Sequence, residues 1–226
     1  MYILKTGTAT DLMRCVDARA HIGIGLLLVV LGAGLASAQL EVTAIFSPSG
    51  SEGDYADIGL DDAWADQPIS PPSCIRISYS AAQSQGQGYA GIIWQYPDSN
   101  YGSQPGMDLS SYDRLTFWAR GELGGEVAEF WAGQSGDTLQ TVSMTVTLSR
   151  QWQQYSLDLS GQDRSSVSGG FAWRATKDQN PLGSTIYLDD IILEEVASQE
   201  PIGPVIETVN DIAAEMPPEV WPYGSG

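Results

Sequence analysis

The sequence contains few of the side chains that polar catalysis uses most often. Among 226 residues there is one histidine, His21, and there are two cysteines, Cys15 and Cys74. His21 and Cys15 both fall in an N-terminal segment that has the features of a removable signal. The remaining chain would hold no Ser-His-Asp or Cys-His site and no imidazole-bound zinc or copper. Cys74 would then have no partner for an internal disulfide, and we expect it to be packed in a strand.

Basic residues are also scarce. Ten Lys and Arg residues stand against 28 Asp and Glu residues, which gives a formal net charge of -18. Such a charge repels nucleic acids and anionic membrane surfaces, so neither is an expected partner. Neutral glycans and calcium are compatible with it, whereas an anionic polysaccharide would need calcium as a bridge. Carboxylate chemistry remains open, but nothing in the sequence selects a catalytic pair.

The N-terminus has the pattern of a secretory signal. Arg14 and Arg19 precede an uncharged apolar run at residues 21–38, which ends in Ala-Ser-Ala. The run is short for a stable membrane span, although a retained membrane anchor is the alternative interpretation. The pattern predicts that residues 1–38 are a signal peptide that is removed. We therefore expect a secreted, periplasmic or cell-surface protein that is not held in the membrane afterwards.

The rest of the chain has the pattern of an all-β domain followed by a tail. Residues 39–196 contain short β-branched and aromatic runs separated by Gly, Ser, Asp and Pro, without a convincing helical period. About nine strands of this kind predict a two-sheet β-sandwich or jelly roll. Residues 197–226 are rich in proline and are predicted to be a disordered tail or linker. The predicted strands lie near Asp57–Asp61, Cys74–Ser80, Ala90–Tyr96, Arg114–Arg120, Glu126–Ala132, Ser143–Leu148, Gln153–Leu159, Gly170–Ala175 and Thr185–Leu193.

Two of these strands carry an aromatic residue beside a charged one on the face opposite their apolar face. Because alternate residues of a strand share a face, Trp118 lies with Arg120, and Trp131 lies with Glu129. Sugar binding uses this mixture, since a flat ring stacks on the C–H face of a pyranose while Arg and carboxylate groups hydrogen-bond to its hydroxyls. Burial in the core is the alternative for any single tryptophan.

Adjacent aspartates in the last predicted strand suggest a metal site. Asp189 and Asp190 point to opposite faces, so one of them is directed inward in an otherwise apolar strand. An inward carboxylate is costly unless it is paired or bound to a metal. Calcium takes oxygen ligands only. The N-terminal part of the domain supplies candidate partners for the inward carboxylate in Asp54, Asp57, Asp61 and Asp62, of which Asp57 and Asp61 are the predicted ligands. The alternative is a solvated pair of acids on an edge strand.

Three strand motifs give the chain a resemblance to a known family. They are L-S-x-Y-x-x-L-T-F-W-A-R at residues 109–120, W-Q-x-Y-x-L-D-L at 152–159 and Y-L-D-D-I at 187–191. With the segments between them, from about residue 47 to 194, they resemble the galactose-binding-like jelly rolls that serve as carbohydrate-binding modules of secreted bacterial glycoside hydrolases.

The resemblance implies a jelly roll with a structural calcium, one ligand of which would be Asp189. It also implies ligand contact through aromatic and polar side chains on the concave sheet or at loop tips. Similar domains often have a second cysteine in the region that corresponds to residues 63–70, where this sequence has none. The resemblance therefore implies that a disulfide to Cys74 has been lost.

These observations predict a secreted, non-catalytic domain that binds a neutral polysaccharide or oligosaccharide. An enzyme is not expected, because the chain offers one sandwich and no recognisable catalytic motif. Two alternatives stay open: a carboxylate-based glycoside hydrolase or lyase on the same sandwich, and a cell-surface adhesion module that binds another protein. The predicted ligand contacts are Trp118, Arg120, Glu129, Trp131 and Trp173, followed by Trp94 and Tyr101.

Overall fold

All nine predicted strands are present, together with two that the sequence pattern did not predict. The computed structural model describes residues 38–195, which form eleven strands and two short 3-10 helices, η1 (Val42–Ala44) and η2 (Tyr55–Asp57). In this part no helix is long and apolar enough to cross a membrane. Residues 1–37 of the predicted signal peptide and the whole predicted tail lie outside it. The strands are β1 (Gln39–Glu41), β2 (Ser47–Gly53), β3 (Ile58–Trp64), β4 (Cys74–Tyr79), β5 (Tyr89–Gln95), β6 (Arg114–Gly121), β7 (Val127–Ala132), β8 (Val142–Thr147), β9 (Gln153–Asp158), β10 (Gly169–Thr176) and β11 (Ser184–Glu194).

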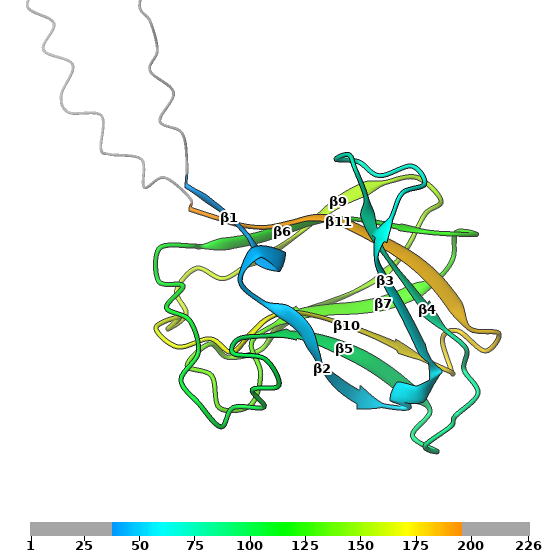
Figure 1. Ribbon diagram of the computed structural model, residues 1–226, viewed down its shortest axis with the longest axis horizontal. Helices are drawn as coiled ribbons and strands as arrows, with labels where there is room; N and C mark the ends of the chain where they lie inside the picture. Colours follow the sequence, from blue (N-terminus) through cyan, green and yellow to red (C-terminus); the bar gives the residue numbers. More distant parts are fainter. Residues whose placement is uncertain (1–37, 196–226) are drawn as a thin grey trace, which may run out of the picture. The chain divides into compact units, whose positions relative to one another are not determined.

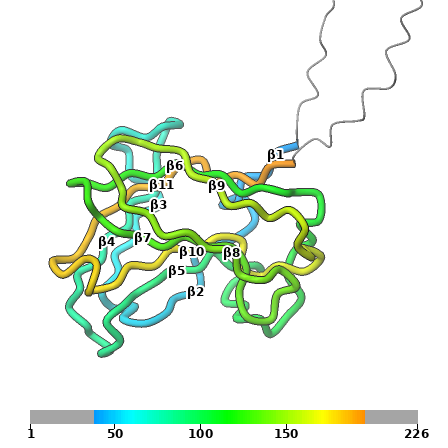
Figure 2. Tube along the Cα trace, turned by 180° about the vertical axis from the view of Figure 1, so that it is seen from behind, coloured from blue at the N-terminus to red at the C-terminus, as the bar shows by residue number. Residues whose placement is uncertain are grey.

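The strands form the two antiparallel sheets of a β-sandwich jelly roll (Figures 1 and 2). The six-stranded sheet has the order β3-β4-β11-β6-β9, with the short β1 also paired to β11. The five-stranded sheet has the order β2-β5-β10-β7-β8. Consecutive strands such as β4 and β5, or β6 and β7, belong to different sheets, so the chain passes back and forth across the sandwich.

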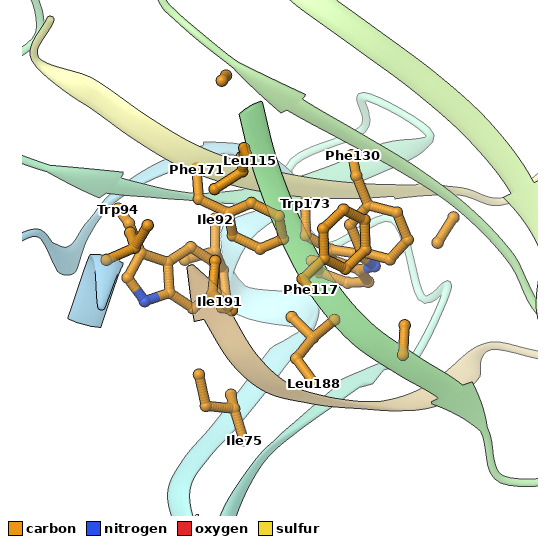
Figure 3. Packing of buried hydrophobic residues seen from close by; sticks show 14 of the residues in the cluster. Ile75, Ile92, Trp94, Leu115, Phe117, Phe130, Phe171, Trp173, Leu188 and Ile191 are labelled. Atoms are coloured by element: carbon orange, nitrogen blue, oxygen red, sulfur yellow. The ribbon is translucent and has the colours of Figure 1, made fainter. Parts of the chain in front are cut away.

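Aromatic side chains from both sheets meet in the core (Figure 3). The ring of Phe117, on β6, lies 4.7 Å from that of Phe130 on β7 and 5.1 Å from that of Phe171 on β10. All three side chains are buried. Complete burial of a large apolar side chain contributes about 1.5–3 kcal/mol, so this group does much to hold the sheets together.

β2 was not predicted because its residues do not alternate. It reads Ser-Pro-Ser-Gly-Ser-Glu-Gly, without the β-branched and aromatic residues that mark a strand. It lies at the edge of its sheet and pairs only with β5, and an edge strand tolerates proline. A Cβ added to Gly50 would come within 2.6 Å of the Gln95 side chain, so glycine allows the close approach to β5. Pairing with β5, rather than local propensity, defines this strand.

The loop at residues 80–88 is held by a buried carboxylate. Asp54 has no exposed surface, and its two oxygens accept the backbone N–H groups of Gln85 (2.7 Å), Gln87 (3.0 Å) and Gly88 (2.7 Å). Burial opposes charge on Asp54, but these hydrogen bonds outweigh it and hold the pKa of Asp54 below its ordinary value. The ionised carboxylate therefore stabilises the folded loop.

Asp54→Asn should lower the melting temperature near neutral pH by about 5–10 °C, because an amide cannot accept all three N–H groups. A carboxyl whose pKa is depressed by folding stabilises the protein above its unfolded pKa, and this contribution is lost as the pH falls through the folded pKa. The difference between wild type and variant should therefore shrink as the pH falls below the ordinary pKa of an aspartate. Thermal unfolding followed by circular dichroism measures it, with the exposed Asp178→Asn as the control. A difference that stays constant with pH would contradict this role.

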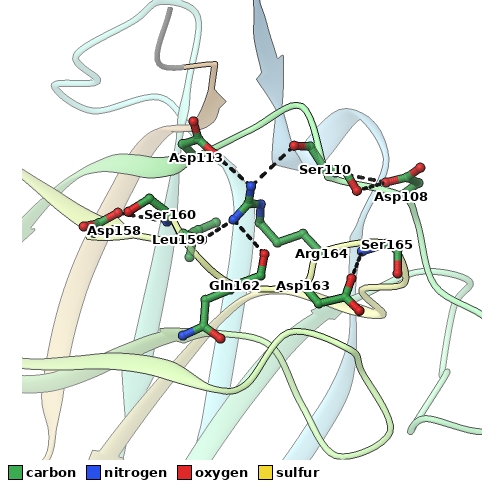
Figure 4. A network of polar contacts seen from close by, with 10 residues as sticks. All are labelled: Asp108, Ser110, Asp113, Asp158, Leu159, Ser160, Gln162, Asp163, Arg164 and Ser165. Atoms are coloured by element: carbon green, nitrogen blue, oxygen red, sulfur yellow. Dashed lines mark hydrogen bonds and ion pairs between the residues drawn. The ribbon is translucent and has the colours of Figure 1, made fainter. Parts of the chain in front are cut away.

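The loops at the other end of the sandwich are tied together by Arg164 (Figure 4). Its side chain is buried and forms an ion pair of 2.8 Å with Asp113, and it also donates to the carbonyl oxygens of Leu159, Gln162 and Ser110. Nearby aspartates accept the N–H of the serine two residues later, as in turns. These acid–serine pairs are Asp108 with Ser110, Asp158 with Ser160, and Asp163 with Ser165. Part of the acidic composition therefore consists of aspartates that stabilise turns.

Cys74 is packed as predicted. It is buried at the start of β4 and is the one free cysteine of residues 38–195. Burial, with a smaller contribution from the charge of Asp189, raises the pKa of the Cys74 thiol to about 11. The thiol therefore stays protonated and unreactive at neutral pH.

Candidate functional site

Two of the predicted ligand contacts are core residues, and those two predictions are wrong. Trp94 is 1% exposed and Trp173 is not exposed at all, and both point between the sheets (Figure 3). Trp94 packs edge to face against Phe171 at a ring separation of 5.3 Å. Alternation along β10 places Trp173 on the same face as Phe171, which is the inward face. Trp173 therefore cannot contact a ligand in this fold, and Trp94 only borders the pocket beside β11, with almost no exposed surface.

The remaining predicted contacts lie on opposite sides of the sandwich. Phe117 and Phe130 meet in the core from different sheets, so the residues next to them in sequence point outward in opposite directions. Trp118, with Arg120, therefore lies on the outer face of the six-stranded sheet. Trp131 lies on the outer face of the five-stranded sheet. The structure does not bring these two groups into one site.

On the five-stranded sheet, one row of residues crosses all five strands and carries charges. The strand registers place Glu52, Gly91, Arg174, Glu129 and Thr145 opposite one another in this order. We call these five residues the polar row. Four strand separations of about 4.8 Å give the row a length of about 19 Å. It is long enough for several units of an extended chain.

Arg174 is the centre of the polar row. Its Nε donates to Glu52 Oε1 at 2.6 Å, and its Nη1 donates to Glu129 Oε2 at 3.1 Å. A Cβ on Gly91 would come within 2.8 Å of Glu52 Oε1, so the glycine leaves room for Glu52 to reach Arg174 across β5. Burial alone would lower the pKa of Arg174, but the hydrogen bond and charge of Glu52 and the charge of Glu129 raise it. The guanidinium is thus firmly charged and fixed in position.

Aromatic rings lie under and beside this guanidinium. Its central carbon is 4.9 Å from the ring centre of Trp131 and 5.2 Å from that of Tyr89. Trp131 belongs to a parallel row with Ile93 and Ala172, which form a small apolar cluster outside the main core. Trp131 is only 6% exposed, so Arg174, which lies over the tryptophan ring, forms the surface at this position. Its expected role as an open stacking platform is therefore not what the structure shows.

Hydroxyl groups extend the site along the edge strand β8. Ser143, Thr145 and Thr147 are exposed and alternate with half-buried apolar residues. Ser143 lies opposite Trp131, and Thr145 opposite Glu129, so the hydroxyls share the outer face with the polar row. Sequence reasoning missed these residues, and it also missed Glu52, Tyr89 and Arg174. Arg174 could have been predicted from its charge, because alternation along β10 places it on the face opposite to that of Phe171.

Tyr101 is exposed, as a ligand contact would have to be. Its side chain is 56% exposed, and its hydroxyl accepts the backbone N–H of Ser51 on β2 at 3.1 Å. This hydrogen bond fixes the loop that carries Tyr101 beside the edge of the five-stranded sheet. Tyr101 is therefore a neighbour of the polar row, and its contact with a ligand stays a prediction.

The outer face of the six-stranded sheet is occupied by the protein's own contacts. Arg120 stacks on Tyr187 at 3.7 Å and lies 5.2 Å from the Trp152 ring. The Trp152 Nε1–H donates to the carbonyl oxygen of Gln67, in the loop between β3 and β4. Trp118 is half-buried on the same face. This stack fixes the loop through Trp152, although the Nε of Arg120 has no hydrogen-bond partner among the described residues. We take the five-stranded face, with its continuous polar row, as the better candidate site.

The aspartates predicted to bind calcium do not come together. η2 holds Asp57 next to the end of β4, level with the first residue of β11, whereas Asp189 lies five residues, or about 16 Å, further along β11. Asp189 instead accepts the backbone N–H groups of Ile69 (2.8 Å) and Ser70 (3.0 Å). Asp61 is exposed on β3, and β4 separates it from β11. These three aspartates therefore do not fit the predicted ligand set.

Acidic residues do share a pocket of about 460 Å³ beside β11. Its lining includes Glu41, Asp62, Asp189 and Asp190. Burial raises the pKa of Glu41. The hydrogen bond from the Thr43 hydroxyl opposes this increase, and the negative charges of Asp190 and Asp189 add to it. Within residues 38–195, however, no group of three or more His, Cys, Asp or Glu residues is arranged to hold a metal ion. Calcium binding stays a prediction.

Comparison with known proteins gives similarity at the level of structure only. No protein-family model matches the chain, and no curated protein matches it. A family 30 carbohydrate-binding module of a cellulosomal cellulase from Clostridium thermocellum is similar, with 18% identity, a TM-score of 0.49, and coverage of 70% of this chain and 99% of the module. A family 11 module from a cellulosomal cellulase of the same organism has 12% identity and a TM-score of 0.48, over 70% of this chain and 94% of the module.

These neighbours are carbohydrate-binding modules. A further family 30 module shares 21% identity with a TM-score of 0.48, over 80% of this chain and 97% of the module.

Proposed function

We propose that this protein binds a neutral polysaccharide or oligosaccharide along the polar row of the five-stranded sheet. The observation that supports this proposal is the fixed guanidinium of Arg174, held between Glu52 and Glu129 above Trp131. A sugar presents adjacent hydroxyls that both donate and accept hydrogen bonds. Arg174 supplies donors, the two carboxylates supply acceptors, and the hydroxyls of β8 supply both.

A neutral ligand fits the charge of the chain. The formal net charge of -18 disfavours polyanions throughout the surface, and the polar row itself holds two carboxylates against one guanidinium. Uronic-acid polymers would therefore meet repulsion at the site. A neutral chain can use the carboxylates as hydrogen-bond acceptors without this cost.

Binding without cleavage is the second part of the proposal. Glycoside hydrolysis uses two carboxyl groups, one of which must be protonated to act as a general acid. Glu52 and Glu129 are both engaged in ion pairs with Arg174, at 2.6 Å and 3.1 Å. The pair therefore suits hydrogen bonding to a sugar better than proton donation to a leaving group. Secretion, inferred from residues 1–38, would place the protein where such polymers occur.

Affinity electrophoresis on native gels tests the proposal. Gels would contain mixed-linkage β-glucan, xyloglucan, galactomannan or arabinoxylan, with pull-down on insoluble cellulose and chitin beside them, each with and without EDTA. We expect at least one neutral polymer to retard or capture the protein, and the EDTA arm tests the calcium prediction in the same assay. Absence of binding to the whole panel would overturn the glycan proposal. Release of reducing sugars or of unsaturated products would instead identify a glycoside hydrolase or a lyase.

A further inference from the structure

Among the outermost strands of the two sheets in residues 38–195, β8 alone lacks the features that protect a sheet edge. The other three carry a proline, a charged residue or a register shift: Pro48 and Glu52 in β2, Asp61 and Asp62 in β3, and Asp158 in β9. β8 reads Val-Ser-Met-Thr-Val-Thr, and its pairing with β7 is regular over all 6 residues. An exposed, regular and uncharged edge strand pairs readily with another strand.

The backbone of β8 presents hydrogen-bonding groups on its open side. The N–H and C=O groups of Val127 bond to the Asn180 side chain, on the side of β7 away from β8. Thr147 lies opposite Val127, so it also turns its N–H and C=O away from this pair of strands. By the alternation of an antiparallel ladder, Ser143 and Thr145 do the same. Within residues 38–195 no strand pairs with this side of β8.

The apolar side chains of β8 are incompletely buried. Val142, Met144 and Val146 pack against the main core but are only half-buried, because β8 is the last strand of its sheet. The alternate side chains, on the outer face, are the exposed hydroxyls described above. A further strand beside β8 would therefore bury more apolar surface without bringing a charge of β8 out of water.

The sequence of β8 is complementary to itself in an antiparallel pair. When Thr145 lies opposite Thr145 of a second copy about a two-fold axis, Ser143 lies opposite Thr147 on the outer face. On the core face, Met144 lies opposite Val146. Pairs of hydroxyl residues and pairs of apolar residues both stabilise neighbouring strands. The net charge of -18 opposes self-association in general, but none of it lies on β8.

From these observations we infer that two copies of this protein associate edge to edge through β8. The five-stranded sheets of the two copies then form one continuous antiparallel sheet. Each polar row ends at Thr145, so the two rows meet and give a joint row of about 43 Å, at about 4.8 Å for each strand separation. A single polysaccharide chain could contact both copies. This use of the joint row rests on the proposed function, whereas the association itself does not.

Sedimentation velocity of the purified protein without glycan tests the inference, from low micromolar to near-millimolar concentration at physiological ionic strength. The average mass should rise with concentration towards that of a dimer. Thr145→Lys and Thr145→Glu should each weaken the association about fivefold or more, because each places like charges opposite one another at the two-fold axis. An equimolar mixture of the two variants should associate again, since a lysine then faces a glutamate.

The matched control is Ser51→Lys, an exposed position on β2 at the opposite edge of the same sheet. It changes the net charge as Thr145→Lys does and should associate as the wild type does. Thr145 is exposed, so its variants should keep the melting temperature of the wild type. Recovery of association in the mixture would also show that both variants are folded.

A monomer at every concentration would overturn the inference. So would a dimer that Thr145→Lys leaves intact, or a mixture that associates no better than either variant alone. A dimer that binds none of the polymers would support edge-to-edge association and overturn only the proposed function. A strict monomer that binds glycan would support the proposed function and overturn the association.

Discussion

Trp173→Ala is expected to lower the free energy of unfolding by about 3–5 kcal/mol, the usual loss when a buried tryptophan is truncated to alanine. Trp173 has no exposed surface and lies in the aromatic core between the sheets (Figure 3). A domain of ordinary stability has only about 5–15 kcal/mol in total, so this variant should be close to unfolding. Urea unfolding followed by circular dichroism measures the loss.

The matched control is Trp173→Phe, which keeps an aromatic ring at the position and should cost clearly less. Trp173→Phe should also bind glycan as well as the wild type, since the residue cannot reach a ligand from the core. A Trp173→Ala protein with the stability of the wild type but without glycan binding would show that Trp173 is a ligand contact after all. The burial described above would then be wrong.

The error at Trp173 shows what alternation along a strand can and cannot tell. Alternation correctly groups Phe171 with Trp173, and Ala172 with Arg174, but it does not say which group faces inward. The charge on Arg174 is the better guide, because an unpaired charge is excluded from a core whereas a tryptophan is not. Had the charged face been followed, Arg174 rather than Trp173 would have been the predicted contact.

The sequence does not show which of the two sheets each strand joins. The strands themselves were predictable, because each of the nine is a short alternating run between turn residues. β6 and β7 follow one another and carry similar aromatic–charge pairs, so the residues of both strands were predicted together as ligand contacts. They belong to different sheets, and only long-range pairing decides that. Trp118 and Trp131 are consequently on opposite faces of the sandwich.

The other omissions have local physical causes. Glu52 was missed because β2 has no strand pattern of its own and exists through pairing with β5. Asp57 was assigned to calcium as a candidate partner for the inward carboxylate of the last strand, and the structure supplies backbone N–H groups to both Asp189 and Asp57 instead. The N–H group of Gln83 donates to Asp57 at 2.7 Å, and Ser84 donates through its hydroxyl. Buried acids in this protein thus take hydrogen-bond donors from loops.

Arg174→Ala is expected to weaken glycan binding about 30-fold or more, the loss typical of a central arginine in a binding site. The substitution removes the donors at the centre of the polar row and leaves Glu52 and Glu129 as like charges without their shared partner. Affinity electrophoresis with whichever polymer retards the wild type measures the effect. Mobility is divided by that in a gel without polymer, so the change in charge cancels.

Arg120→Ala is the matched control, because it also removes a guanidinium stacked on aromatic rings and changes the net charge equally, but on the opposite face. It should bind glycan as the wild type does. Arg174→Lys should fall between wild type and Arg174→Ala, since lysine keeps the charge but cannot form two fixed hydrogen bonds with Glu52 and Glu129. Retained binding in Arg174→Ala together with its loss in Arg120→Ala would move the site to the six-stranded sheet.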